Sequence, residues 1–333
     1  MNDLQTTRNL RKVAYFGSPD FSASLLSQIL KNQQKLGVQV ALVFTQPDKP
    51  AGRKMQLRQT PVKELALRAD IPVFDKPFKQ NISEIVSSLQ QNNVDLALLF
   101  AFNEIIPREV LTVPTLGFWN VHPSLLPQYR GPSPVSFPLI LGDTQTGVTL
   151  TQMDAKMDTG DVISQITYPI EFKNTQETVL AGVPHRAYEL IEKGLANTDD
   201  LVRAKQNDTH ATYTRKLKRE DGYVAWNVMQ KLLNAQHVAG SLPIIEWYRQ
   251  RNPSYTPPEY TTLEQLFNLW RGLHPWPGVW TEVMIGSESK RLKIIEMEHE
   301  DESFHITKVQ LEGRQVVSFQ EFTASFPQKQ NSK

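Results

Sequence analysis

The sequence has no cysteine among its 333 residues. Without cysteine, a protein cannot form disulfides, bind a metal through thiolates or use a cysteine nucleophile, so these three kinds of site are excluded. The absence of disulfides also fits a reducing compartment. Residues 1–11 are polar and lack the apolar stretch of a signal peptide. We therefore expect a cytoplasmic protein.

Long hydrophobic runs and an excess of one charge are also absent. No stretch approaches the roughly 18 consecutive apolar residues that a membrane-spanning helix needs, so we expect no membrane partner. Lysine and arginine number 36 against 35 aspartates and glutamates, which gives a net charge of +1. A nucleic-acid partner would therefore have to be recognised through a local basic patch. The chain is 40% hydrophobic and long enough for two domains.

In the first two hundred residues, short apolar segments alternate with amphipathic ones. Strands are expected at 12–16, 38–44, 96–100, 117–121 and 147–153, and helices at 20–30, 61–69, 82–91 and 176–205. This alternation is typical of an α/β fold with a doubly wound, mainly parallel sheet. Such sheets bind ligands at the carboxyl ends of their strands. The pattern predicts a first domain over residues 1–206.

The character of the sequence changes after residue 206. Short strand-like segments follow one another at 279–285, 291–297, 305–311 and 315–318. Short strands separated by turn residues indicate a small β-rich domain of the compact, OB-like barrel type. The sequence thus predicts a second, β-rich domain over residues 207–330.

The residues most suggestive of chemistry lie in GFWNVHPSLLPQYRG, residues 117–131. Asn120 and His122 are two positions apart on an expected strand, so their side chains lie on the same face. An amide and an imidazole at a strand end can donate hydrogen bonds to an oxygen that gains negative charge. The loop MDAKMDTGD, residues 153–161, contains three aspartates, one of which could pair with the imidazole and orient it.

Each of these residues also has a structural explanation. An asparagine or histidine at a strand end can satisfy local backbone groups, and Asp158 in Asp-Thr-Gly suits a turn. The first strand is followed by Gly17-Ser18-Pro19 and not by GxGxxG, which excludes a dinucleotide-binding loop. No spaced set of His, Asp and Glu ligands is evident, so no metal is expected.

In combination, the motifs resemble the folate-dependent formyltransferase superfamily. Asn120-Val121-His122 matches its catalytic Asn-x-His and is followed by Ser-Leu-Leu-Pro at 124–127 and by Arg130-Gly131. Met-Asp-Thr-Gly-Asp at 157–161 matches the motif of its catalytic aspartate, which falls on Asp158. Segments 17–21, 44–53, 211–217 and 275–278 match in order, so the resemblance spans nearly the whole chain. It favours the branch of the superfamily that formylates methionyl-tRNA.

This resemblance implies a Rossmann-like catalytic domain and a tRNA-binding second domain. The reaction would move the formyl group of 10-formyltetrahydrofolate to the amino group of initiator methionyl-tRNA, without a metal. The catalytic residues would be Asn120, His122 and Asp158. The reduced folate would be bound by Phe102, Ile105, Ile106, Ser124, Leu125, Leu126 and Pro127. The tRNA would be bound by Arg53, Arg130, Arg215 and Lys216.

Several alternatives stay open at this point. The same catalytic residues fit an enzyme that formylates a nucleotide-linked amino sugar, or a hydrolase that passes the formyl group from folate to water. A non-catalytic RNA-binding protein on the same fold is a further alternative. Compared with the family, residues 227–273 form an inserted segment without an assigned role. We expect a monomer.

Overall fold

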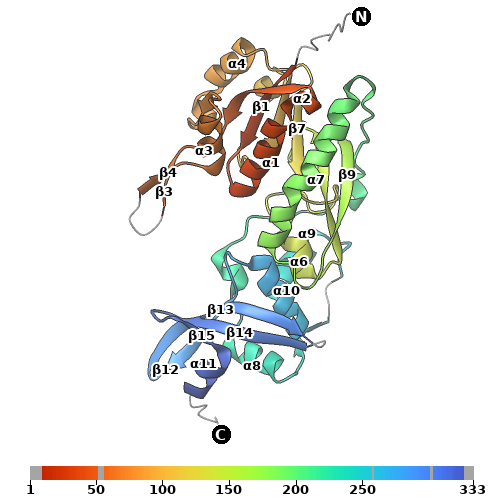
Figure 1. Cartoon of the computed structure of the whole chain (residues 1–333). Coiled ribbons are helices and arrows are strands. Elements are labelled where there is room, and N and C mark those ends of the chain that lie inside the picture. Colours follow the sequence, from red (N-terminus) through yellow and green to blue (C-terminus); the bar gives the residue numbers. More distant parts are fainter. Residues whose placement is uncertain (1–9, 52–55, 257–258, 301–302, 326–333) are drawn as a thin grey trace, which may run out of the picture. The chain divides into compact units, whose positions relative to one another are not determined.

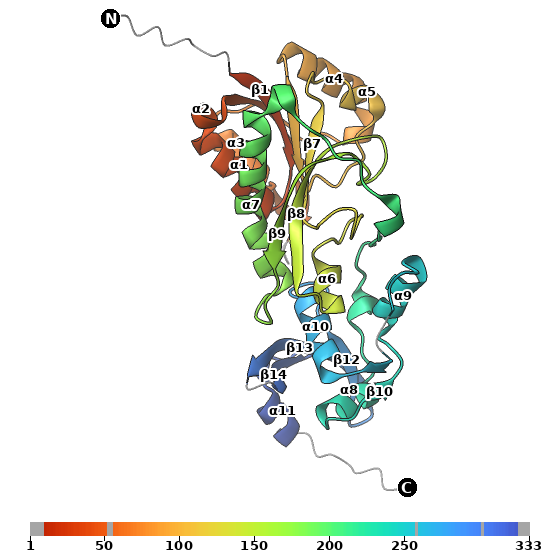
Figure 2. The same ribbon diagram turned by 90° about the vertical axis from the view of Figure 1, so that its right-hand side faces the viewer.

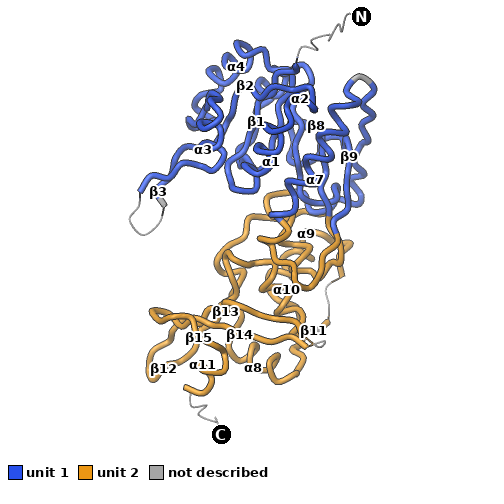
Figure 3. Tube along the Cα trace, in the orientation of Figure 1, with its two compact units in different colours: residues 1–130, 147–168, 180–211 blue, residues 131–146, 169–179, 212–333 orange. Residues whose placement is uncertain are grey.

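The computed structural model describes residues 10–51, 56–256, 259–300 and 303–325 (Figure 1). The chain divides into two compact units (Figure 3). The first comprises residues 1–130, 147–168 and 180–211, and the second comprises 131–146, 169–179 and 212–333. Two segments that precede residue 207 in the sequence thus belong to the second unit.

The first unit is built on a seven-stranded sheet in the order β5-β2-β1-β6-β7-β8-β9. Its strands are β1 (Arg11–Gly17), β2 (Val38–Phe44), β5 (Val73–Phe74), β6 (Leu96–Phe100), β7 (Phe118–His122), β8 (Gln145–Gln152) and β9 (Val162–Pro169). The pairs from β5 to β7 are parallel, whereas β8 runs antiparallel to β7. The predicted mainly parallel sheet is confirmed, and the direction of pairing changes at β7.

Helices cover both faces of this sheet (Figure 2). They are α1 (Asp20–Lys31), α2 (Gln33–Leu36), α3 (Pro61–Arg68), α4 (Ile82–Gln91), α5 (Arg108–Leu111) and α7 (Gln176–Ala196), with 3₁₀ turns η1 (Phe78–Gln80), η2 (Thr198–Asp200) and η3 (Asp208–His210). Val13 and Tyr15 of β1 pack in one apolar cluster with α1, α3 and α7. Ala14 and Phe16 pack in a second cluster with α4 and α5. Burial on both faces explains why the strands are continuous apolar runs.

The basic segment after β2 contains a hairpin that the sequence did not reveal. Strands β3 (Lys49–Ala51) and β4 (Gln56–Arg58) pair antiparallel. At the base of the hairpin, Lys63 Nζ on α3 lies 2.8 Å from an Asp48 oxygen and 2.6 Å from an Asp75 oxygen. Arg53, which the sequence predicted to contact tRNA, lies outside the described residues.

Helix α7 is shorter than the sequence predicted. It ends at Ala196, whereas helical spacing extended the expectation to residue 205. Beyond it, the backbone of Ala204 exchanges two hydrogen bonds with that of Val162 at the start of β9. An extended segment can make this pairing and a helix cannot, so the sheet edge decides the conformation. Val202, which lies beyond the end of α7, is 82% exposed.

The second unit contains the predicted β-rich part of the chain. Its four-stranded sheet has the order β12 (Trp280–Ile285), β13 (Glu288–Glu300), β14 (Ser303–Leu311) and β15 (Val316–Ser318), with every pair antiparallel. Helix α11 (Phe319–Ser325) follows the last strand. Three of the predicted strands match within a few residues, while β13 is longer than expected.

The segment around residues 227–273 is mostly helical. It includes α9 (Pro243–Arg251), α10 (Leu263–Leu273), most of α8 (Trp226–Leu233), and a ribbon of β10 (Val238–Ala239) and β11 (Tyr260–Thr261); η4 (Arg219–Gly222) precedes it. Helix α10 packs against α6 (Ser136–Leu141). At their contact a Cβ on Gly272 would lie 2.6 Å from Ile140, so glycine permits the close approach. None of the described helices combines the length and apolarity required to cross a bilayer.

Candidate active site

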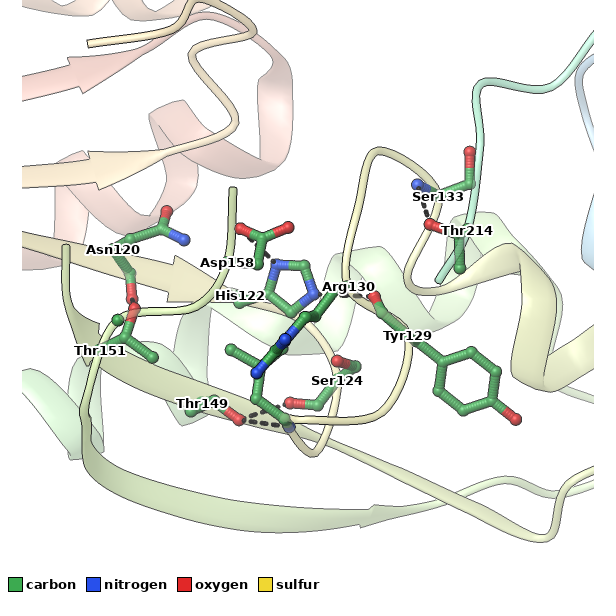
Figure 4. Close-up of polar contacts among 12 residues, drawn as sticks. Asn120, His122, Ser124, Tyr129, Arg130, Ser133, Thr149, Thr151, Asp158 and Thr214 are labelled. Carbon is green, nitrogen blue, oxygen red and sulfur yellow. Dashed lines mark hydrogen bonds and ion pairs between the residues drawn. The ribbon is translucent and has the colours of Figure 1, made fainter. Parts of the chain in front are cut away.

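The candidate site lies at the carboxyl end of β7, which delivers Asn120 and His122. Their backbones pair with β8 at Thr151 and Thr149, so both residues are held within the sheet. The two residues are 8% and 5% exposed, and their side chains lie on the same side of the strand (Figure 4). The period of two along a strand, from which the sequence predicted this arrangement, is confirmed.

Asp158 comes to the site from the loop between β8 and β9. Its carboxylate Oδ1 lies 3.6 Å from Nδ1 of His122, a distance that allows an ion pair when the imidazole is protonated. The backbone of Asp158 has φ +55°, in the left-handed region that aspartate tolerates better than most residues. The structure therefore brings the three predicted catalytic residues together.

The neighbour of Nε2, the second ring nitrogen of His122, determines which nitrogen of the neutral ring carries the proton. Nε2 lies 3.0 Å from the carbonyl oxygen of Tyr129. A carbonyl oxygen only accepts hydrogen bonds, so Nε2–H donates to it. Nδ1 then faces Asp158, and protonation at Nδ1 creates a cation opposite the carboxylate. The ring is thus oriented from both sides.

The side-chain amide of Asn120 is the free donor of the site. Within the described part of the chain, this amide has no hydrogen-bond partner, although Asn120 is only 8% exposed. Figure 4 shows the amide on the same side as Asp158 and Nδ1 of His122. An amide that no protein group engages is available to donate to an oxygen of a ligand. An oxygen of a bound substrate between the amide and the imidazole would accept this hydrogen bond.

The segment from Ser124 to Pro127 is fixed to β8. Thr149 Oγ1 donates to the Ser124 carbonyl at 2.6 Å and accepts from the Leu126 N–H at 3.1 Å. Ser124 Oγ donates to the carbonyl of Gln128 at 2.7 Å and is fully buried. Leu126 is 4% exposed, and its peptide bond to Pro127 is cis. The hydrogen bonds of Thr149 and Ser124 fix the main chain of this segment beside the catalytic residues.

The predicted folate-binding residues of the 102–106 segment differ in exposure. Phe102 and Ile106 are 2% and 4% exposed and belong to an apolar core cluster, in which Phe102 lies 5.3 Å from the ring of Phe16. Ile105, in contrast, is 65% exposed. Only Ile105 of these three side chains presents substantial apolar surface to a ligand.

The predicted basic residues also have different surroundings. Arg130 is 1% exposed and donates to Gln206 and Asp208. Arg215 lies in the second unit, where its guanidinium forms two 2.7 Å hydrogen bonds to Asp221 and stacks over Trp247 at 4.6 Å. Lys216, beside it, is exposed.

Sequence reasoning missed Gln206. Its side-chain amide donates to the backbone carbonyls of Asp158 and Gly160 at 2.9 and 2.7 Å. A single glutamine in a connecting segment has no local signal, because its partners are 46 and 48 residues away in the sequence.

Comparison with known proteins places this site in a family. Residues 11–195, which include all three catalytic candidates, match the family described as formyl transferase, and residues 261–305 match its C-terminal domain. The chain is 31% identical to a methionyl-tRNA formyltransferase of Caldicellulosiruptor saccharolyticus, over 86% of this chain and 79% of that protein. It is 31% identical to the Geobacter metallireducens methionyl-tRNA formyltransferase over 94% of each chain.

The fold has counterparts among solved structures. An N-formyltransferase of Helicobacter canadensis, in complex with folinic acid and dTDP-3-aminofucose, superimposes with a TM-score of 0.54. The alignment covers 89% of this chain and 95% of that one at 17% identity. This likeness concerns the fold.

Proposed function

The chain belongs to the methionyl-tRNA formyltransferase family, and we propose that it transfers the formyl group of 10-formyltetrahydrofolate to the amino group of initiator methionyl-tRNA. The observation that carries this proposal is the convergence of an amide, an imidazole and a carboxylate at the end of β7. Among the described residues, none engages the side-chain amide of Asn120, and Nδ1 of His122 lies 3.6 Å from Asp158. Such a set of groups can stabilise a developing oxyanion and move a proton.

The chemistry follows from these positions. The deprotonated α-amine attacks the formyl carbon, a new C–N bond forms, and the formyl oxygen becomes an oxyanion. The Asn120 amide donates a hydrogen bond to that oxygen. Nδ1 of His122 accepts the proton that the amine loses, the new Nδ1–H donates to the oxyanion, and Asp158 stabilises the imidazolium. The bond from the formyl carbon to N10 then breaks, while the proton lost by the amine is delivered to N10. Holding both substrates in line supplies much of the rate.

The reduced folate would bind along the rigid main chain of Ser124–Pro127 and the segment of residues 102–107. Main-chain groups suit the polar edges of a pterin, and the exposed side chain of Ile105 offers apolar contact. The reaction needs no metal, since both the oxyanion and the proton have protein partners. We place the reaction in the cytoplasm and assign it to a monomer.

The tRNA would be recognised outside the catalytic residues. Lys216 is exposed, as phosphate contact requires, and Arg215 is fixed by Asp221 beside it. Arg53, in the segment between β3 and β4, is proposed to contact the end of the acceptor stem. These assignments concern binding and not the chemical step.

A transfer assay with labelled formyl folate tests the proposal. The enzyme is offered initiator methionyl-tRNA, a nucleotide-linked amino sugar, or water alone. Label on the tRNA is the expected result. Label on the amino sugar, or formate release at the same rate without an acceptor, would replace the proposal by one of the two alternatives.

A further inference from the structure

We propose that Gln206 is a positioning residue for Asp158, and that the buried guanidinium of Arg130 orients Gln206 for this task. The inference rests on the proposed function in one respect, namely that Asp158 takes part in the chemical step. All the residues involved belong to the first compact unit. The two side chains connect the end of the β7 segment to the loop that carries the catalytic carboxylate.

The hydrogen bonds of Gln206 use its whole amide. Its Oε1 accepts from Arg130 Nε at 3.1 Å and from an Arg130 terminal nitrogen at 2.8 Å. Its Nε2 donates to the carbonyls of Asp158 at 2.9 Å and Gly160 at 2.7 Å. A guanidinium only donates and carbonyls only accept, so the amide fits in one orientation alone. Arg130 thus fixes which end of the amide faces the loop.

Burial and backbone pairing hold Arg130 and Gln206 in place. Arg130 is 1% exposed, and its guanidinium donates to Gln206 and to the exposed Asp208. The chain before Gln206 is tied to β9 by the paired backbones of Ala204 and Val162. A buried charge is tolerated where hydrogen bonds satisfy it, and such a group keeps a fixed position. Burial also favours this role for Arg130 over direct contact with tRNA.

The loop needs such support because its conformation is demanding. Asp158 adopts φ +55°, and a Cβ on Gly160 would lie 1.9 Å from the Gln152 carbonyl oxygen. Left-handed backbone at a non-glycine residue persists where the surroundings enforce it. The two bonds from Gln206 hold the carbonyls on either side of Thr159. They thereby set the direction in which the Asp158 carboxylate points toward His122.

The isosteric variant Gln206→Glu tests this role. The carboxylate keeps the acceptor for Arg130 but presents an oxygen, in place of two N–H donors, to the carbonyls of Asp158 and Gly160. We expect kcat to fall by about 10- to 100-fold, the effect of displacing a catalytic group by an ångström or so, with both KM values within about twofold of wild type. The kcat of Gln206→Met, which removes the hydrogen bonds without adding charge, should be lowered by a similar factor.

A double-mutant cycle separates positioning from general destabilisation. In an Asp158→Asn background, single-turnover rates should change less than about twofold on adding Gln206→Glu, because the carboxylate that Gln206 positions is gone. The matched control is Asp208→Asn, which changes a second acceptor of the Arg130 guanidinium and leaves the hydrogen bonds of Gln206 to the loop in place. Its kcat should stay within about twofold of wild type.

Two results would overturn the inference. One is an equal loss of rate from Gln206→Glu in both backgrounds, and the other is a raised folate KM with unchanged kcat. A crystal structure of Gln206→Glu gives a readout independent of activity. The distance from Asp158 Oδ1 to Nδ1 of His122 should exceed the present 3.6 Å while the sheet superimposes. This readout holds even if the wild-type enzyme proves to use another acceptor, so the two proposals fail separately.

Discussion

The two ring nitrogens of His122 have different roles, and the role of each follows from the group that lies next to it. Nε2–H donates a hydrogen bond to the Tyr129 carbonyl, which leaves Nδ1 for Asp158 and for the substrate. A neutral ring in this tautomer can accept a proton at Nδ1, and an imidazolium can return it. The carboxylate across the 3.6 Å gap is therefore the residue on which the proton transfer depends.

Replacing Asp158 by asparagine tests this dependence. The variant keeps the size of the side chain and removes its charge, so the imidazolium loses its partner. We expect kcat to fall by about 10²- to 10⁴-fold with little change in either KM, measured by steady-state formyl transfer. The control is Asp154→Asn in the same loop, where the carboxylate accepts from Thr159 and the Lys156 backbone. Near-wild-type kcat for Asp158→Asn would exclude the assigned role.

Asn120 allows a matched pair of substitutions. Asn120→Ala removes one oxyanion donor and should lower kcat by about 10²- to 10³-fold. Asn120→Asp keeps the shape but faces the oxyanion with a carboxylate, so its loss should be at least as large. Binding of formyl folate, followed by fluorescence or calorimetry, should stay within a few-fold for Asn120→Ala. If the main effect were on folate affinity, Asn120 would be a binding residue and not a catalytic one.

At the scale of elements, Lys63 of α3 connects the base of the β3–β4 hairpin to the residue that follows β5 through ion pairs with Asp48 and Asp75. Partial burial would lower the pKa of the Lys63 ammonium, but hydrogen bonds to Asp48 and Asp75 outweigh it and raise that pKa above its usual value. A cation whose pKa is raised by folding stabilises the protein at all pH values below its unfolded pKa of about 10.4. This contribution is lost as the pH rises through the folded pKa.

Lys63→Met should reveal that contribution. The variant should unfold at a lower temperature than wild type between pH 7 and 9. Because wild-type Lys63 loses its charge at high pH, the difference should shrink above about pH 10.4. Thermal unfolding followed by circular dichroism measures this difference in unfolding temperature. The control is Lys76→Met, which breaks the surface ion pair to Glu84 and should have little effect. A difference independent of pH would mean that packing, and not charge, is responsible.

Much of this architecture could be predicted because the strands are apolar on both faces. Apolar runs such as residues 96–100 predict buried parallel strands. The alternation of side chains along a strand predicts that Asn120 and His122 lie on the same face. The end of α7 could not be predicted, since the pairing of Ala204 with Val162 overrides helical spacing. Gln206 has no sequence signal, because its role exists only through contacts with Arg130 and with the Asp158 loop.

At the scale of the whole molecule, the charge of +1 leaves little long-range attraction for an RNA. Recognition then rests on a few local cations. In the second unit, Lys216 is exposed while Arg215 is engaged with Asp221 and Trp247. The two neighbouring residues should therefore respond differently to substitution.

Lys216→Ala should raise the KM for methionyl-tRNA, leave the folate KM unchanged, and reduce the slope of log affinity against log salt by about one. Arg215→Ala should instead lower thermal stability, because it leaves the Asp221 carboxylate, whose side chain is 8% exposed, without its cation. The exposed Lys231 of α8 provides the control for Lys216. Equal salt slopes for Lys216→Ala and wild type would show that this lysine does not contact phosphate.

The second unit is assembled from three separate stretches of chain, residues 131–146, 169–179 and 212–333. Its helix α6 lies in the first of these and packs against α10 in the last. A protein fragment that ends at residue 211 would therefore contain α6 without α10. The apolar side chains of α6 that normally pack against α10 would be exposed and would promote aggregation. A single protease nick after residue 211 would have another outcome, since the α6–α10 contact would hold the two pieces together through gel filtration until a denaturant separated them.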